Sequence, residues 1–323
     1  MMKTFNANNS GIGTRKIVYF PGLNALRYFA AAAVVICHVE EFKAVNLLPT
    51  RYDVVYGLGT LAVTFFFVLS GFLITFLLLT EKEKYGTINI QSFYIRRALR
   101  IWPLYYLISV LGLFILPHIS ALTIPTLSSK VDAQQPVNSL LYLFFLPNIA
   151  LGLKYVVPYA SHLWSIGVEE QFYLFWPWIF KSAKRQLAIM IFIIVAFFFM
   201  RLSCQYLINN LPGFRETGNA LYEILDRTRI DCMAIGGIGA FLIYGNAQWV
   251  RRYFINFPAA VTSILLPLAL VVTSIKFAHI QHLLFAVCFL VFIINVSCSE
   301  RSIFRLEGKL WDFLGNISYS IYM

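Results

Sequence analysis

"LGTLAVTFFFVLSGFLITFLLL" (residues 58–79) decides the fold class, because it runs without a single charged side chain. A helix needs about 20 apolar residues to cross the hydrocarbon core of a bilayer. The stretch is therefore long enough for one complete crossing and longer than the apolar runs that form core helices of soluble domains. We predict a transmembrane helix over these residues.

The rest of the chain repeats this pattern. Of its 323 residues, 59% are hydrophobic and 13% are charged, whereas a soluble domain carries about 25% charged residues. This composition is typical of a protein that crosses the membrane several times. Besides the stretch above, the apolar segments are residues 23–41, 101–117, 140–153, 162–180, 187–208, 229–244, 254–275, 280–297 and the closing 310–323.

We predict an all-α fold, a polytopic transmembrane bundle of about ten helices. The last helix is expected to be incomplete at Met323. Residues 1–20 are expected to form a basic N-terminal tail, and residues 21–323 a single integral membrane domain. The segment 140–153 is short for a complete crossing, so the prediction leaves open whether it crosses or re-enters.

The formal net charge of +11 also follows the membrane pattern. Basic side chains gather in short segments beside apolar runs, as the positive-inside rule describes, and this favours membrane lipid over nucleic acid as the partner. We expect a multi-pass protein of the cell inner (plasma) membrane. The basic residues that we place on the cytoplasmic side are Lys3, Arg15, Lys16, Lys82, Lys84, Arg96, Arg97 and Arg100.

The segment "LRYFAAAAVVICHV" (residues 26–39) carries two costly side chains, Arg27 and His38. Eleven steps of about 100° return them to nearly the same helix face, roughly 16 Å apart, with Asn24 one turn earlier. Arg27 is either a snorkelling residue or part of a site. His38 is either a hydrogen-bonded core histidine or a general base, which is the usual role of neutral imidazole near pH 7.

The segment "FYIRRALRIWPLYY" (residues 93–106) places Arg97 and Arg100 three residues apart on one helix face, while Arg96 points elsewhere. Guanidinium groups bind phosphate oxygens with two parallel hydrogen bonds. The arginine pair is expected to bind either lipid headgroups or a phosphorylated cofactor.

The segment "HLWSIGVEEQFY" (residues 162–173) contains adjacent carboxylates, Glu169 and Glu170, in an otherwise apolar run. Neighbours on a helix project about 100° apart, so the two are expected to have different partners. Ser165 and Tyr173 lie four residues either side of Glu169. One carboxylate is expected to orient a histidine or bind a substrate hydroxyl, or else to pair with an intramembrane arginine.

The segment "RTRIDCMAIGGIGAF" (residues 227–241) contains Arg227 and Asp231, whose spacing allows them to pair on one face. Its three glycines, Gly236, Gly237 and Gly239, suit close helix packing. The five cysteines show no metal-binding spacing, and we predict no metal site.

Taken together and in this order, these segments resemble acyltransferase family 3, a family of integral membrane acyltransferases. Its most specific features here are the ten-residue gap between Arg27 and His38 and the W-S-x-x-x-E-E-x-F-Y pattern of residues 164–173. The R-x-x-R pattern of residues 97–100 and the closing "LGNISYSIYM" add to the resemblance.

The resemblance implies about ten transmembrane helices and transfer of an acyl group, most often acetyl. The donor would be cytoplasmic acyl-coenzyme A, and the acceptor a hydroxyl of a glycan, a lipid-linked sugar or another cell-envelope molecule. Many members have an aspartate where this chain has Thr64, so the role of that aspartate is not carried over. The implied site residues are His38, Arg27, Glu169 and Glu170 for catalysis and Arg97, Arg100 and Arg229 for the donor, with Asp231 beside them.

A second class of protein also fits the residues alone. Ionisable side chains within membrane spans often form proton relays. His38, Glu169 and Glu170 are therefore also compatible with a proton-coupled membrane transporter.

Overall fold

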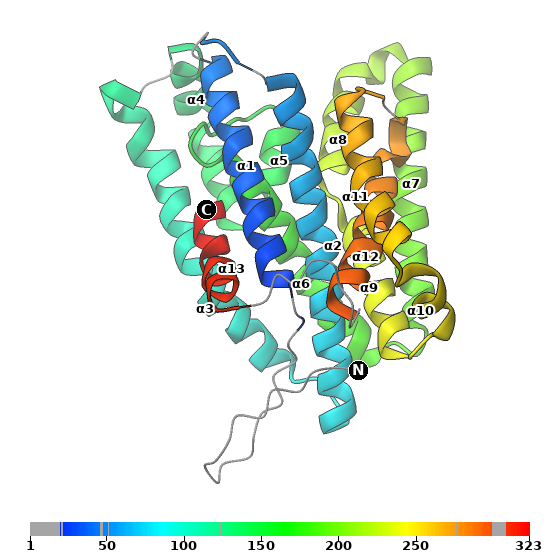
Figure 1. Ribbon diagram of the computed structural model, residues 1–323. Helices are drawn as coiled ribbons and strands as arrows, with labels where there is room; N and C mark the ends of the chain where they lie inside the picture. Colours follow the sequence, from blue (N-terminus) through cyan, green and yellow to red (C-terminus); the bar gives the residue numbers. More distant parts are fainter. Residues whose placement is uncertain are drawn as a thin grey trace. The chain divides into compact units, whose positions relative to one another are not determined.

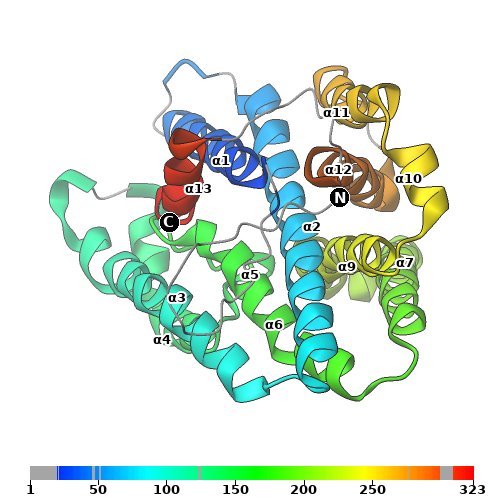
Figure 2. The same cartoon turned by 60° about the horizontal axis from the view of Figure 1, so that its bottom comes forward.

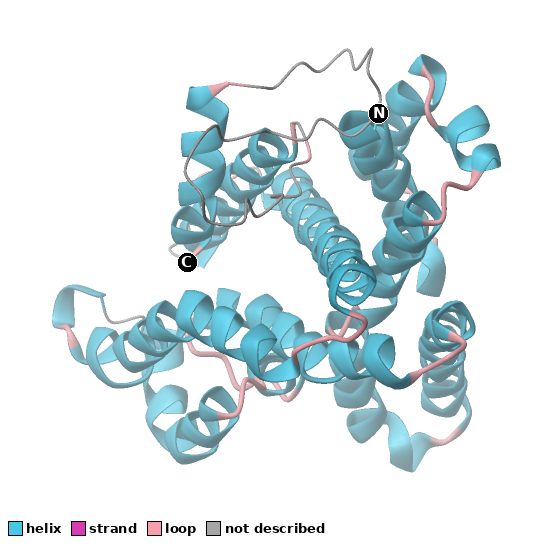
Figure 3. Ribbon diagram, turned by 90° about the horizontal axis from the view of Figure 1, so that it is seen from below, coloured by secondary structure: helices cyan, strands magenta, loops and turns pink. Residues whose placement is uncertain are grey.

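The computed structural model describes residue 20 and residues 22–45, 48–50, 52–122, 125–275, 277–298 and 308–323. Apart from residue 20, the predicted N-terminal tail lies outside these residues. The described chain consists of helices and the loops between them, with no strand in these ranges (Figure 3). The predicted all-α fold class is confirmed.

Five of the described helices are long and apolar enough to cross a membrane, or six if one bent pair counts as a single span. The bent pair joins Pro212–Tyr244 to Gln248–Phe254. The five are Leu23–Ala44, Val55–Tyr85, Ile90–His118, Gln186–Asn210 and Gln281–Cys298.

The short apolar segment 140–153 does not form one helix. It is divided between the end of α4 (Pro125–Leu143) and α5 (Pro147–Gly152). Phe145, between the two helices, has a positive φ of 57°, which few non-glycine residues adopt. Pro147 follows at the first turn of α5, where proline is well tolerated because its missing N–H has no helical partner. The chain therefore breaks here.

The described chain forms two compact units, which we describe separately. The first comprises residues up to 77 together with 235–322, and the second comprises 78–234 with Met323. The boundaries fall within α2 (Tyr52–Tyr85) and α9 (Ile230–Tyr244). The assignment of residues 21–323 to a single domain stays a prediction.

In the first unit, α13 (Lys309–Tyr322) packs along α1 (Leu23–Val45), and the two ribbons lie side by side in both views (Figures 1 and 2). Asn24 of α1 donates a hydrogen bond from Nδ2 to Asp312 Oδ1 of α13 at 2.9 Å. Phe29 contacts Trp311, with ring centroids 5.4 Å apart. The other helices wholly within this unit are α10 (Gln248–Phe254), α11 (Phe257–Val272) and α12 (Gln281–Cys298), and α11 packs against α12.

The glycines of α9 allow close packing in this unit. A β-carbon at Gly236 would collide with the backbone of α2 at Val68, and one at Gly239 would collide with Leu290 of α12. The predicted close-packing role is confirmed for these two glycines.

The second unit begins with the last turns of α2 and continues into α3 (Ile90–Val110). Asn89 caps α3, because its side chain accepts a hydrogen bond from Ser92 N at 2.9 Å. After α3 the chain continues through the π-helical turn Leu111–Ile115 and the 3-10 turns Leu116–His118 and Ser120–Leu122. The unit also contains α4, α5, α6 (Trp164–Ser182), α7 (Gln186–Asn210) and α8 (Arg215–Arg227).

Candidate functional site

The first group of predicted site residues lies on α1. Arg27 and His38 are both half-buried. His38 Nδ1 lies 2.9 Å from Oε2 of Glu41, one turn further along the same helix. This contact gives the histidine a carboxylate partner that was not among the predicted site residues.

The signal for Glu41 was present in the sequence. Residues three apart on a helix are neighbours, so the spacing of His38 and Glu41 in "CHVEE" already allowed this pair. The prediction instead assigned the tuning of the histidine to the glutamates of residues 169–170.

The second group lies where α3 contacts α6. The Arg97 guanidinium lies over two aromatic rings, 5.7 Å from the centroid of Phe93 and 5.5 Å from that of Tyr173. Arg97 Nε is buried and has no hydrogen-bond partner among the residues that the structure describes. A half-buried arginine with an unused donor is suited to binding an anion.

The two adjacent glutamates of α6 reach different partners, as predicted. Glu169 Oε2 accepts a hydrogen bond from Tyr173 OH at 2.8 Å, so the ring under Arg97 is fixed by Glu169. Glu170 Oε2 accepts a hydrogen bond from Trp102 Nε1 of α3 at 3.0 Å. Within the described chain, Glu170 Oε1 is buried without a hydrogen-bond partner.

The same contact between α3 and α6 is held by a further pair of hydrogen bonds. Tyr94 OH donates to the Leu174 carbonyl oxygen at 2.6 Å and accepts from Trp178 Nε1 at 2.9 Å. These bonds fix the register of the two helices. We name Tyr94, Arg97, Trp102, Glu169, Glu170, Tyr173 and Trp178 the α3–α6 seam.

The other two arginines of the predicted basic segment lie apart from Arg97. Arg100 is exposed. Arg96 is also exposed and pairs with Glu81, with NH2 and Oε2 3.4 Å apart. The prediction that Arg96 points elsewhere is confirmed. Replacing Arg96 is therefore a matched control for replacing Arg97.

Arg229 lies at a different place in the second unit. It is 6% exposed, donates from Nε to the Asp226 carbonyl oxygen at 3.0 Å, and lies over the Trp164 ring, 5.8 Å from its centroid. Trp164 begins α6, and Tyr173 lies nine residues later, roughly 13 Å along the helix axis. The structure therefore does not bring Arg229 to the position of Arg97.

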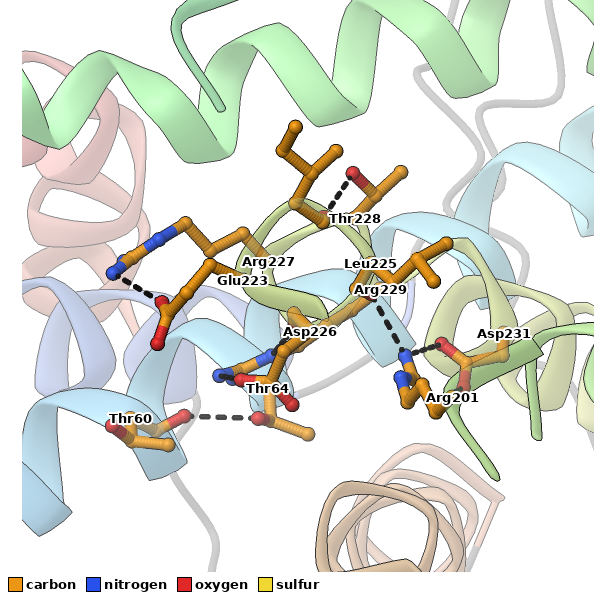
Figure 4. A network of polar contacts seen from close by, with 11 residues as sticks. Thr60, Thr64, Arg201, Glu223, Leu225, Asp226, Arg227, Thr228, Arg229 and Asp231 are labelled. Carbon is orange, nitrogen blue, oxygen red and sulfur yellow. Dashed lines mark hydrogen bonds and ion pairs between the residues drawn. The ribbon is translucent and has the colours of Figure 1, made fainter. Parts of the chain in front are cut away.

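The predicted pair of Arg227 and Asp231 is wrong. Arg227 pairs with Glu223 at 3.0 Å on α8, whereas Asp231 accepts from Arg201 of α7 (Figure 4). Arg201 NH1 lies 2.6 Å from Asp231 Oδ2, and both side chains are completely buried. The helix breaks between Arg227 and Ile230, so the assumed helical spacing does not hold across this segment.

Sequence reasoning also missed Arg201. Its signal was a lone arginine inside the apolar segment 187–208, a position that needs a compensating partner. The partner lies 30 residues further along the chain, a separation at which helix periodicity predicts nothing.

The position where many family members carry an aspartate has a local role in this chain. Thr64 is completely buried and donates to the Thr60 carbonyl oxygen of the preceding turn at 2.9 Å (Figure 4). The Thr64 hydroxyl therefore donates its proton within α2.

The structure thus brings Arg97, Glu169 and Glu170 to one helix contact in the second unit. Arg27 and His38 share one helix of the first unit, roughly 16 Å apart along its axis. In the described residues, no three His, Cys, Asp or Glu side chains are grouped so that they would hold a metal ion.

Comparison with known proteins gives the family. The peptidoglycan O-acetyltransferase OatA of Listeria monocytogenes is 32% identical over 168 residues, which are 49% of this chain and 24% of that protein. The O-acetyltransferase OatA of Staphylococcus aureus (strain NCTC 8325 / PS 47) is 32% identical over 160 residues, again 49% of this chain and 24% of that protein. The match thus covers about a quarter of the length of these relatives. No solved structure matches the chain. A family model described as an acyltransferase domain matches residues 20–323, so the chain belongs to acyltransferase family 3, as its motifs predicted.

Proposed function

We propose that the chain is a membrane O-acyltransferase that moves an acetyl group from acetyl-coenzyme A to a hydroxyl of a cell-envelope glycan or lipid-linked sugar. Family membership supports the reaction class. The names of the two relatives support an O-acetyl product and a glycan acceptor. The observation that carries the proposal is the α3–α6 seam. There Arg97 lies over the ring of Tyr173, whose hydroxyl donates to Glu169. On the same helix as Arg97, Trp102 donates to Glu170.

Arg97 is the proposed anchor of the donor phosphates. Its guanidinium is oriented by the rings of Phe93 and Tyr173, and its Nε has an unused donor. Arg100, exposed three residues later on the same helix, supplies a second positive charge. Two guanidinium groups at the end of an apolar span suit a polyanionic ligand that approaches from the cytoplasmic side of the plasma membrane.

His38 is the proposed general base. It takes the proton of the acceptor hydroxyl, and the oxygen lone pair attacks the thioester carbonyl carbon. The carbon–sulfur bond then breaks, and its electron pair leaves with sulfur as the thiolate of coenzyme A. The thiolate takes the proton back from the imidazolium, so the products are an ester and the free thiol. Arg27, on the same helix, is proposed to stabilise negative charge that develops on the carbonyl oxygen.

Glu170 is proposed to hold the acceptor. Trp102 fixes one of its carboxylate oxygens, and the other is buried without a partner in the described chain. A substrate hydroxyl that donates to this oxygen would remove the cost of leaving it unsatisfied. Glu169 has a supporting role, because it fixes the Tyr173 ring beneath Arg97. Arg229 is proposed to contribute positive charge from its buried position over Trp164.

The experiment is a donor-binding titration. Purified protein in lipid nanodiscs is titrated with labelled acetyl-coenzyme A, as wild type, Arg97→Ala and the matched control Arg96→Ala. Loss of a hydrogen bond between charged groups costs about 1.5–3 kcal/mol, so Arg97→Ala should weaken binding by roughly tenfold or more. Arg96→Ala should bind like the wild type, because Arg96 pairs with Glu81.

Equal affinity of Arg97→Ala and the wild type would refute the role of Arg97. If the wild-type protein binds no acetyl-coenzyme A but carries a proton-coupled flux, the result would refute the acyltransferase function and support the transporter function.

A further inference from the structure

Of the two adjacent glutamates that follow His38 on α1, Glu41 contacts the imidazole, and this contact points to a function. Two adjacent carboxylates follow His38, and they have different partners. Glu40 Oε1 lies 2.6 Å from Lys43 Nζ, and Glu40 Oε2 accepts from Thr50 Oγ1 at 2.8 Å. Glu41 Oε2 instead lies 2.9 Å from His38 Nδ1. The Glu40 carboxylate is thus bound by a lysine and a threonine hydroxyl, while the Glu41 carboxylate contacts the imidazole.

Helix α13, which packs against α1, brings a carboxylate to the N-terminal end of α1, far from His38. On α13, Asp312 is bound by Asn24, which lies fourteen residues before His38, roughly 21 Å along the helix. Where α2 approaches α1, Gly59 lies against Cys37. Glu41, one turn from His38 on the same helix, is therefore a carboxylate in hydrogen-bond contact with the His38 ring.

The ionisation state of the carboxylate decides which atom donates in the hydrogen bond between His38 and Glu41. An ionised carboxylate carries no hydrogen and can only accept. The Nδ1 atom must therefore carry the proton in this hydrogen bond, and the other ring nitrogen, Nε2, is then the basic one. Nε2 lies on the opposite side of the ring from Glu41.

We propose that Glu41 is a positioning residue for His38, which holds the ring in the tautomer whose Nε2 accepts the hydroxyl proton. This inference rests on the proposed function. When Nε2 takes that proton, the imidazolium carries a positive charge next to the Glu41 carboxylate, which stabilises it. When the departing thiolate takes the proton back from Nε2, the Nδ1 proton stays on the ring throughout. Glu41 itself neither gains nor loses a proton.

The test combines a spectroscopic and a kinetic measurement. In protein labelled with ¹⁵N-histidine, the His38 signal is identified among those of the five histidines by its loss in His38→Ala. The wild type should show the Nδ1-protonated tautomer, and Glu41→Gln should lose this preference. Glu40→Gln is the matched control, because the adjacent carboxylate binds Lys43 and Thr50, and it should retain the wild-type tautomer and rate.

In the acetyl-transfer assay, Glu41→Gln should lower kcat roughly 10- to 100-fold. This is less than the roughly 10²- to 10⁴-fold contribution of a general base, because the imidazole itself remains. KM for acetyl-coenzyme A should stay within about twofold. Glu41→Asp should restore part of kcat. Because Glu41 acts through His38, adding Glu41→Gln to His38→Ala should lower the residual rate no further.

The outcomes separate this inference from the proposed function. A wild type that transfers no acyl group refutes the proposed function, whatever the tautomer. A wild type that transfers acetyl while Glu41→Gln matches it in kcat and tautomer refutes only the role of Glu41. Additive losses in the double variant would also refute it, because they would mean that Glu41 acts independently of His38.

Discussion

Replacing Arg201 by methionine should destabilise the protein more than any exposed-charge substitution in the second unit. The guanidinium of Arg201 donates three hydrogen bonds: NH1 to Asp231 Oδ2 at 2.6 Å, NH2 to Asp231 Oδ1 at 3.3 Å, and NH2 to the Leu225 carbonyl oxygen at 3.3 Å. Neither charged side chain is exposed. The substitution therefore leaves a carboxylate buried without its cation.

The magnitude follows from the burial. Removing one partner of a buried ion pair costs about 3–5 kcal/mol, because the remaining charge is uncompensated. In proteins of 150–250 residues, 1 kcal/mol shifts the melting temperature by roughly 2–4 °C. This chain is longer, so we expect the smaller shift per kcal/mol and a fall of roughly 6–10 °C for Arg201→Met. The double variant Arg201→Met/Asp231→Leu should recover much of the loss, because an apolar pair leaves no buried charge.

The assay is thermal unfolding of the detergent-solubilised protein, followed by the fraction that remains monodisperse after heating. The matched control is Glu223→Gln, which breaks the partly exposed pair with Arg227, a type of pair worth about 0.3–0.5 kcal/mol. A melting temperature for Arg201→Met within about 2 °C of the control would contradict this prediction, since the buried pair would then contribute no more than a surface pair.

Two further predictions concern α9 and the proposed base. Gly236→Ala should lower the free energy of unfolding by about 1–3 kcal/mol or more, because the new β-carbon meets the α2 backbone at Val68. Gly213→Ala, whose β-carbon meets nothing within 4 Å, should stay within about 0.5 kcal/mol in the same melting assay. His38→Ala should lower acetyl transfer by roughly 10²- to 10⁴-fold while donor binding and melting temperature stay near wild type, and an unchanged rate would remove its role as base.

Local features of the site could be predicted from the sequence because they depend on helix periodicity alone. Glu169 and Tyr173 are four residues apart within α6, and their hydrogen bond follows from that spacing. The divergence of Glu169 and Glu170 follows from the 100° step between neighbours. The same rule allows the pair of His38 and Glu41, which are three residues apart on α1.

The remaining features depend on tertiary packing. Spacing could not pair Trp102 with Glu170, because 68 residues separate them and only the contact between α3 and α6 brings them together. For Asp231, helix periodicity predicted the wrong partner. Its local candidate, Arg227, belongs to a different helix, and Arg201 reaches it from α7.

The proposed reaction is transfer of an acetyl group from acetyl-coenzyme A to a hydroxyl. The most direct test reconstitutes the purified chain in liposomes with acetyl-labelled coenzyme A and a glycan acceptor, and measures label in base-labile ester on the acceptor by mass spectrometry. Ester formation should match the release of free coenzyme A thiol and should fall roughly 10²- to 10⁴-fold in His38→Ala. Release of thiol without ester on any hydroxyl acceptor, or equal ester formation by His38→Ala, would contradict it.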